Sequence, residues 1–109
     1  MAKQLINKAS LLTLATGAVL LMGSSVFADG ASLFNDKGCA GCHGADAKTP
    51  IMGAYPKVAG QNKDYLIQQL KDIKSGARNN GQSASMKGIM AGVNEDEINV
   101  IASYLSELK

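Results

Sequence analysis

"KGCAGCHGA", residues 37–45, contains both cysteines of this 109-residue chain and its single histidine. Three kinds of site use such a pattern. A thioredoxin-like dithiol needs a preceding strand in a β-α-β unit, and no strand pattern precedes Cys39. A zinc site built on Cys39, Cys42 and His43 would need a carboxylate as its fourth ligand. The third interpretation is C-x-x-C-H as a covalent haem attachment motif.

The spacing suits haem attachment best. A helical turn presents the sulfurs of Cys39 and Cys42 to one edge of a porphyrin, where they add to its two vinyl groups, and His43 then reaches the iron. A disulfide between the cysteines would close only a tiny loop and would stabilise the fold little. We therefore expect one covalently bound haem c per chain, with the zinc site and the dithiol as alternatives.

The first 28 residues have the pattern of a cleavable secretion signal. Lys3 and Lys8 precede an apolar stretch, residues 11–22, and Val26-Phe27-Ala28 resembles a signal peptidase site. The alternative is an uncleaved membrane anchor, but the strongly apolar part has only about twelve residues and a spanning helix needs about twenty. The prediction is a leader over 1–28, one domain over 29–109 and a periplasmic location without a membrane span.

The predicted mature chain carries no net charge. Removing residues 1–28 takes two of the 11 basic residues and none of the nine acidic ones, which leaves nine of each. The basic excess typical of proteins that bind nucleic acid or anionic membranes is therefore absent from the sequence. A domain of this size has a small core and commonly needs a staple such as a prosthetic group. We expect a monomer.

Helical patterns dominate the rest of the sequence, and no strand pattern interrupts them. A short helix is predicted over 31–38, ending at Gly38, and a longer one follows Asn62 and ends at Gly76. Residues 44–61 and 77–85 are rich in glycine, proline or small polar residues and are predicted to be loops.

The last helix is predicted to begin at Asn94. Its apolar residues Ile98, Ile101, Ala102 and Leu105 follow helical spacing, and Glu97 lies where a capping box needs it. The fold class is thus all-α, with three to four short helices around one haem. Four apolar residues are expected to pack either around the haem or against each other: Leu66, Leu70, Ile101 and Leu105.

From Gly30 to Leu108 the sequence resembles the class I c-type cytochromes, in particular the short bacterial cytochromes c-553 and single domains of the dihaem cytochromes c. Four segments occur in the family's order: "LFNDKGCAGCHG", "YPKVAGQNKDYLIQQLKDIKSGAR", "MKGIMAGVNEDEI" and "VIASYLSEL". The resemblance implies the small class I cytochrome c fold and an electron-transfer function without catalysis.

The resemblance also implies the iron ligands. His43 would be one axial ligand, and the family places a methionine shortly before the last helix, where Met86 stands in "SMKGIM". Gly88 is expected to allow a tight passage of the backbone in this loop. Met90 is the runner-up for Met86, and Met52 or an open coordination position are further alternatives.

Supporting roles follow from the same resemblance. A proline carbonyl would accept the second N–H of His43, with Pro56 as the candidate and Pro50 as the alternative. Phe34 and Tyr104 would join the first and last helices. Arg78 would either meet a haem propionate or remain a solvated loop residue.

The expected function is one-electron transfer between a membrane respiratory complex or dehydrogenase and a terminal oxidase or reductase, through transient contacts near Cys39 and Cys42. The alternative is a haem c subunit docked permanently on a catalytic partner, or a gas-binding sensor.

Overall fold

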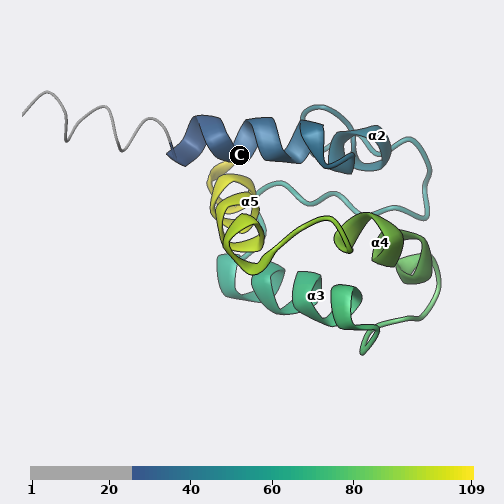
Figure 1. The fold of residues 1–109 in the computed structure, drawn as a ribbon. Helices are drawn as coiled ribbons and strands as arrows, with labels where there is room; N and C mark the ends of the chain where they lie inside the picture. Colours follow the sequence, from purple (N-terminus) through teal and green to yellow (C-terminus); the bar gives the residue numbers. More distant parts are fainter. Residues whose placement is uncertain (1–25) are drawn as a thin grey trace, which may run out of the picture.

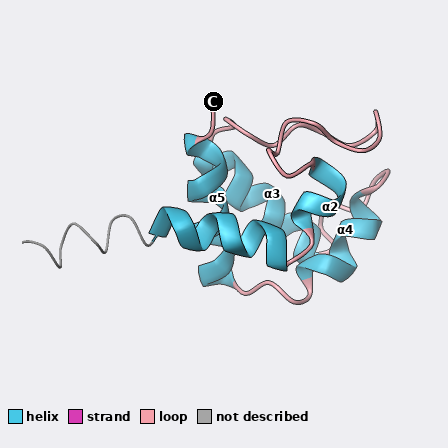
Figure 2. Ribbon diagram, turned by 90° about the horizontal axis from the view of Figure 1, so that it is seen from above, coloured by secondary structure: helices cyan, strands magenta, loops and turns pink. Residues whose placement is uncertain are grey.

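The computed structural model describes residues 26–109, and every regular element in this part of the chain is a helix. An N-terminal helix over 26–36 is followed by α2 (Cys39–His43), α3 (Lys63–Ser75), α4 (Ser83–Met90) and α5 (Glu95–Glu107). α3 packs against α4 and α5, and Figure 1 shows the N-terminal helix lying across α5. Figure 2 shows long loops joining the helices. The all-α prediction is confirmed.

The N-terminal helix is longer than predicted. It covers 26–36 rather than starting at residue 31, so its first three residues belong to the expected leader. Residues 1–25 of that leader lie outside the described residues. The predicted stop is confirmed, because Gly38 has a φ of 90° and turns the chain into α2. A glycine adopts this left-handed conformation without a steric penalty.

The N-terminal helix and α5 meet through aromatic side chains and a close backbone approach. The ring centroids of Phe34 and Tyr104 lie 6.1 Å apart, and Phe34 is only 1% exposed. A Cβ added to Gly30 would lie 2.4 Å from the Cβ of Tyr104, so a larger residue would force the helices apart. The predicted contact between the first and last helices is therefore confirmed.

The predicted boundaries of α3 and α5 are also confirmed. The side chain of Asn62 accepts a hydrogen bond from the backbone N–H of Tyr65 at 3.0 Å, and Gly76 ends α3 with a φ of 87°. At α5, Asn94 Oδ1 accepts from the Glu97 N–H at 2.8 Å, and Glu97 Oε1 accepts from the Asn94 N–H at 3.0 Å. This reciprocal pair is the capping box, which satisfies two backbone donors that a helix start leaves open.

The core is built mainly on one face of α5. Ile98, Ile101, Ala102 and Leu105 are each 3% exposed or less, as their helical spacing predicts. Phe34, Met90 and Val93 pack into the same cluster. Burying side chains of the larger kinds contributes about 1.5–3 kcal/mol each, so this face of α5 accounts for much of the stability.

The prediction of a loop up to residue 85 is partly wrong, because α4 begins at Ser83. Ser83 and Met90 are buried, and Met86 is half-buried between them along the helix. Their spacing of three and four residues defines one helical face. Apolar periodicity in the sequence does not reveal this face, because its first buried residue is a serine, which is polar.

The tight backbone passage expected at Gly88 is also wrong. Gly88 lies within α4, without a positive φ. A Cβ added at this position would meet no atom within 4 Å. The helix therefore does not require a glycine here.

The segment over 44–61 is irregular, as predicted, and is held by backbone hydrogen bonds. The carbonyl of Ala47, a fully buried residue, accepts from the N–H groups of Val58 and Ala59 at 3.0 and 3.1 Å. The Ile51 N–H donates to the carbonyl of Cys42 at 3.1 Å. These bonds fold the loop back against α2 and bring Pro56 near His43.

Within residues 26–109, no helix combines the length and the apolar character needed to cross a membrane.

Candidate cofactor-binding site

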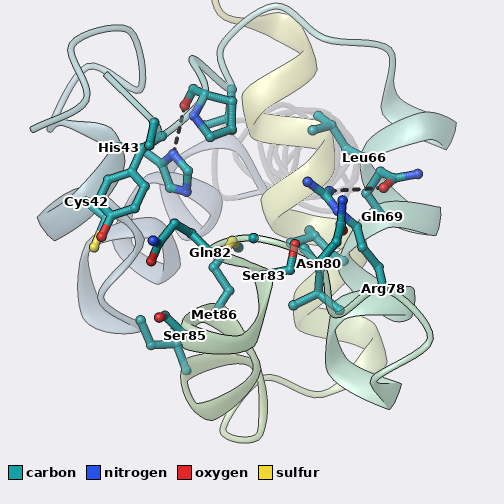
Figure 3. Close-up of a pocket in the computed structure, with 18 of the residues that line it drawn as sticks. Cys42, His43, Leu66, Gln69, Arg78, Asn80, Gln82, Ser83, Ser85 and Met86 are labelled. Atoms are coloured by element: carbon teal, nitrogen blue, oxygen red, sulfur yellow. Dashed lines mark hydrogen bonds between the residues drawn. The ribbon is translucent and has the colours of Figure 1, made fainter. Parts of the chain in front are cut away.

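A cavity of about 340 Å³ opens between α2, the loop after it, α3 and α4. Figure 3 shows its side chains converging from these elements. Its apolar wall comes largely from α3 and its polar side from the segment before α4. The residues that line it include Cys42, His43, Tyr55, Pro56, Leu66, Gln69, Leu70, Ile73, Arg78, Met86 and Ile89.

His43 is held in one orientation on the cavity wall. Its side chain is buried, at 5% exposure, and its Nδ1 lies 2.8 Å from the carbonyl oxygen of Pro56. Because a carbonyl only accepts hydrogen bonds, Nδ1 carries the proton and donates. The lone pair of Nε2 is then available to a metal ion. Pro56, not Pro50, supplies this carbonyl.

The two cysteines lie one helical turn apart in α2. Both thiols are free and partly buried; Cys42 lines the cavity, whereas Cys39 packs beside it against the core. Burial raises the pKa of the Cys39 thiol, which opposes the reactive thiolate that a redox dithiol requires. Among the described residues, no group of three or more His, Cys, Asp and Glu is arranged to hold a metal ion, so the zinc interpretation loses its support.

The three methionines of the predicted domain have different surroundings. Met86 is half-buried and lines the cavity. Met90 is 1% exposed and packs in the core, and Met52 is 49% exposed on the loop. Figure 3 shows Met86 and His43 directed into the cavity from different elements. The arrangement favours Met86 over Met90 and Met52 as the partner of His43.

Arg78 is an ordered part of the cavity wall rather than a solvated loop residue. Its Nη1 donates to Oε1 of Gln69 at 3.0 Å, and its backbone N–H donates to the carbonyl of Asp72 at 3.0 Å. The guanidinium is thus fixed where it can pair with an anionic group in the cavity. Contact with a propionate stays a prediction.

The contribution of Gln69 to the cavity wall is not among the predictions from the sequence, although the sequence contains a signal for it. Gln69 stands three residues after Leu66 and four before Ile73, so helical spacing places it on the same face of α3. Tyr55 was missed too; its ring centroid lies 6.4 Å from that of His43. Nothing in the irregular spacing of its loop predicted this contact.

Four apolar residues are expected to pack either around the haem or against each other, and two of them take each kind of position. Leu66 and Leu70 line the cavity, whereas Ile101 and Leu105 belong to the core and are not part of its wall. The α3 pair thus forms part of the cavity wall, and the α5 pair takes part in ordinary helix packing.

The residues around the cavity fit a haem group. The volume lies within the range of small-molecule sites, roughly 300–1,000 Å³. The apolar wall of α3 suits a porphyrin ring, the Arg78 guanidinium suits its carboxylates, and an imidazole and a thioether are the donors of many electron-transfer haems. A buried imidazole whose tautomer is fixed beside a cavity is poorly explained by packing alone.

Comparison with known proteins agrees with this assignment. A family model for cytochrome c matches residues 27–109. Cytochrome c-553 from Nitratidesulfovibrio vulgaris (strain DSM 19637 / Miyazaki F) is 35% identical over 103 residues, which are 93% of this chain and 99% of that protein. Cytochrome c4 from Azotobacter vinelandii is 37% identical over 71 residues, which are 64% of this chain and 34% of the relative.

The fold has a counterpart among solved structures. The crystal structure of reduced recombinant cytochrome c4 from Pseudomonas stutzeri matches with a TM-score of 0.68 and 30% sequence identity. The match covers 79% of this chain and 50% of the cytochrome c4 chain. The chain therefore spans nearly the whole length of the first relative and half or less of the two cytochromes c4.

Proposed function

Because this chain belongs to the cytochrome c family, we propose that it is a soluble one-electron carrier of the periplasm that uses His43 and Met86 as iron ligands. Members of this family bind haem c covalently and transfer electrons, and they do not catalyse a reaction themselves. The attachment sites in this proposal are Cys39 and Cys42.

The observation that carries the proposal is the pairing of His43 and Met86 across one cavity. When bound there, the haem supplies a reversible change between Fe(III) and Fe(II). A thioether ligand favours the ferrous state relative to a second nitrogen ligand and raises the potential. Two protein ligands also leave no coordination position for a substrate, which separates a carrier from a haem enzyme or gas sensor.

The remaining residues of the site hold these ligands and exclude water. The Pro56 carbonyl fixes the imidazole, so that a change of charge at the metal requires little movement of His43. The side chains of Leu66, Leu70 and Ile73 form the dry wall. Such a wall lowers the local dielectric and penalises the more highly charged ferric state.

The proposed partners are a membrane respiratory complex or dehydrogenase as donor and a terminal oxidase or reductase as acceptor. Exposed apolar side chains occur around the cavity. Ile89 and Tyr65 line it, and Ile51 lies close by, because its backbone N–H donates a hydrogen bond to the carbonyl of Cys42, a lining residue. A few exposed apolar side chains at such a site suit contacts that form and dissociate quickly. The secretion signal predicted over 1–28 supports the periplasmic location.

Carbon monoxide binding and redox titration together test this function. The ferrous holoprotein is expected to titrate as a single reversible one-electron couple and to bind no carbon monoxide at neutral pH, because Met86 occupies the sixth position. Met86→Ala is expected to bind carbon monoxide and to have a lower potential.

Carbon monoxide binding by the wild-type protein under the same conditions would favour the sensor instead. Isolation of the chain only as part of a stable complex with a large interface would favour the permanently docked subunit.

A further inference from the structure

Two lysine side chains hold the short connection between α4 and α5. Nζ of Lys37 donates to the carbonyl of Gly92 at 2.8 Å, and Nζ of Lys74 donates to the carbonyl of Val93. Neighbouring carbonyls of one turn thus bind ammonium groups from two separate elements. In Figure 1 this connection runs between the N-terminal helix and α3. Lys37 directly follows the N-terminal helix, and Lys74 lies in α3.

The two lysines come from separate elements beside the cavity. Lys37 precedes Cys39 by two residues, in the turn that leads into α2. Lys74 lies in the last turn of α3, directly after Ile73 of the cavity wall. A hydrogen bond from either residue therefore ties the α4–α5 connection to elements that border the cavity.

α4 packs against α3, but its own burial is limited. Only Ser83 and Met90 of its eight residues are buried, and most of the others are exposed. No side-chain hydrogen bond caps its first turn. The C-terminal end is better held, since Met90 and Val93 are buried and the Val93 N–H donates to the Met90 carbonyl at 3.1 Å. The position of Met86, one turn before Met90, therefore depends on the connection as well as on the packing of α4 against α3.

Glu97 ties the Lys37 contact to the start of α5. Its Oε2 lies 3.3 Å from Nζ of Lys37, while its Oε1 accepts from the Asn94 N–H in the capping box. The side chains of Lys37 and Glu97 are 29% and 22% exposed, so this pair is only partly screened by water. Lys37 is thereby oriented towards Gly92.

We propose that Lys37 and Lys74 form a clamp that holds Met86 on the iron, as positioning residues for the sixth ligand. The inference rests on the proposed ligation by His43 and Met86. Each lysine stabilises the arrangement of the α4–α5 connection in which the thioether reaches the cavity. Without either one, a larger fraction of folded molecules has Met86 detached.

Imidazole binding to the ferric holoprotein measures that fraction. Added imidazole must displace Met86, so its apparent dissociation constant is the intrinsic constant divided by the fraction of molecules with an open site. Loss of one hydrogen bond to a charged group shifts such an equilibrium by about tenfold to a hundredfold. Lys37→Met and Lys74→Met are each expected to tighten apparent imidazole binding by about tenfold or more.

Lys71→Met is the matched control. Lys71 lies on the same helix as Lys74 and its Nζ is 3.9 Å from Oε1 of Glu95, with both side chains well exposed. The variant removes the same charge without touching the connection. We expect its imidazole affinity to stay within about twofold of wild type, since exposed pairs contribute little.

Met86→Ala distinguishes positioning of the ligand from a general effect on the cavity. In that background imidazole displaces nothing, so adding Lys37→Met or Lys74→Met is expected to leave its affinity unchanged. The clamp would be overturned if the lysine substitutions tightened imidazole binding equally with and without Met86. It would also be overturned if both single lysine variants bound imidazole with wild-type affinity.

Two further outcomes keep the test decisive. If the lysine variants yield no holoprotein, Glu97→Gln removes the charge beside Lys37 and keeps an oxygen for the cap; unchanged imidazole binding would then overturn the clamp. If the wild type lacks the sulfur-to-iron absorption band, the proposed ligation fails and the clamp with it. If the band is present and the lysines have no effect, only the clamp fails.

Discussion

At the scale of single residues, the 2.8 Å contact between Nδ1 of His43 and the Pro56 carbonyl determines which ring nitrogen is free to bind iron. The sequence contains two prolines after the haem motif, and residue types alone leave both open as partners. The choice depends on the path of the loop over 44–61, which is set by backbone bonds such as Ile51 N–H to Cys42 carbonyl. Such bonds leave no side-chain pattern in the sequence.

Glu97 is expected to make stability depend on pH. The hydrogen bond from the Asn94 N–H, assisted by Lys37, lowers the pKa of this carboxyl below its ordinary value. A lowered pKa in the folded state adds stability above the ordinary carboxyl pKa, and that stability is lost as the pH falls through the folded value. Urea unfolding of holoprotein between about pH 3 and 7 should therefore show a weaker acid dependence for Glu97→Gln. An unchanged slope against pH would contradict the assignment.

At the scale of helices, the boundaries of α3 and α5 follow from the sequence because their caps are local. Asn62, Gly76 and Asn94 with Glu97 act on backbone groups within a few residues, so the sequence contains all the required information. α4 is not predicted, because its buried face of Ser83, Met86 and Met90 becomes apparent only where it packs against α3. Long-range packing decides that helix.

Gly88 tests the corrected description of α4, and Gly76, which ends α3, gives the contrasting case. Gly88→Ala adds a methyl group in open space within a helix and is expected to stabilise the protein by about 0.5–1 kcal/mol. Gly76→Ala places a side chain at a φ of 87° and 2.9 Å from Nζ of Lys87, and is expected to cost about 1 kcal/mol or more. Thermal unfolding of both holoproteins measures the difference. Loss of iron ligation in Gly88→Ala would instead indicate the tight loop that the sequence predicts at that glycine.

At the scale of the whole molecule, the polypeptide fills its core only in part, and we expect the haem to complete it. The cavity separates α2 from α3 and α4, while the main apolar cluster lies around α5. Side chains of Leu66, Leu70 and Ile73 face the cavity from α3. Without the prosthetic group these walls would be exposed to water, which a domain of this size can hardly tolerate.

Removal of both attachment residues tests this coupling between haem and fold. The double variant Cys39→Ala with Cys42→Ala is expected to lose the haem and with it most of its cooperative thermal unfolding. Circular dichroism during heating, compared with the wild-type holoprotein, gives the measurement. A haem-free variant with wild-type helicity and a sharp transition would refute the coupling.

Export gives a second test at this scale. If the leader is removed after Ala28, the intact mass should equal the chain from Asp29 to Lys109 plus one haem, in protein released from the periplasm without detergent. A product that keeps residues 1–28 and needs detergent would instead indicate the membrane anchor.

The most direct test of the central claim is the near-infrared absorption band that reports a bond between a thioether sulfur and ferric haem iron. We expect this band in the wild-type holoprotein and its loss in Met86→Ala. Met90→Ala should keep the band and lose about 2–5 kcal/mol of stability, because Met90 is buried in the core. A band that survives in Met86→Ala but disappears in Met90→Ala, or that is absent from the wild type, would contradict ligation by Met86.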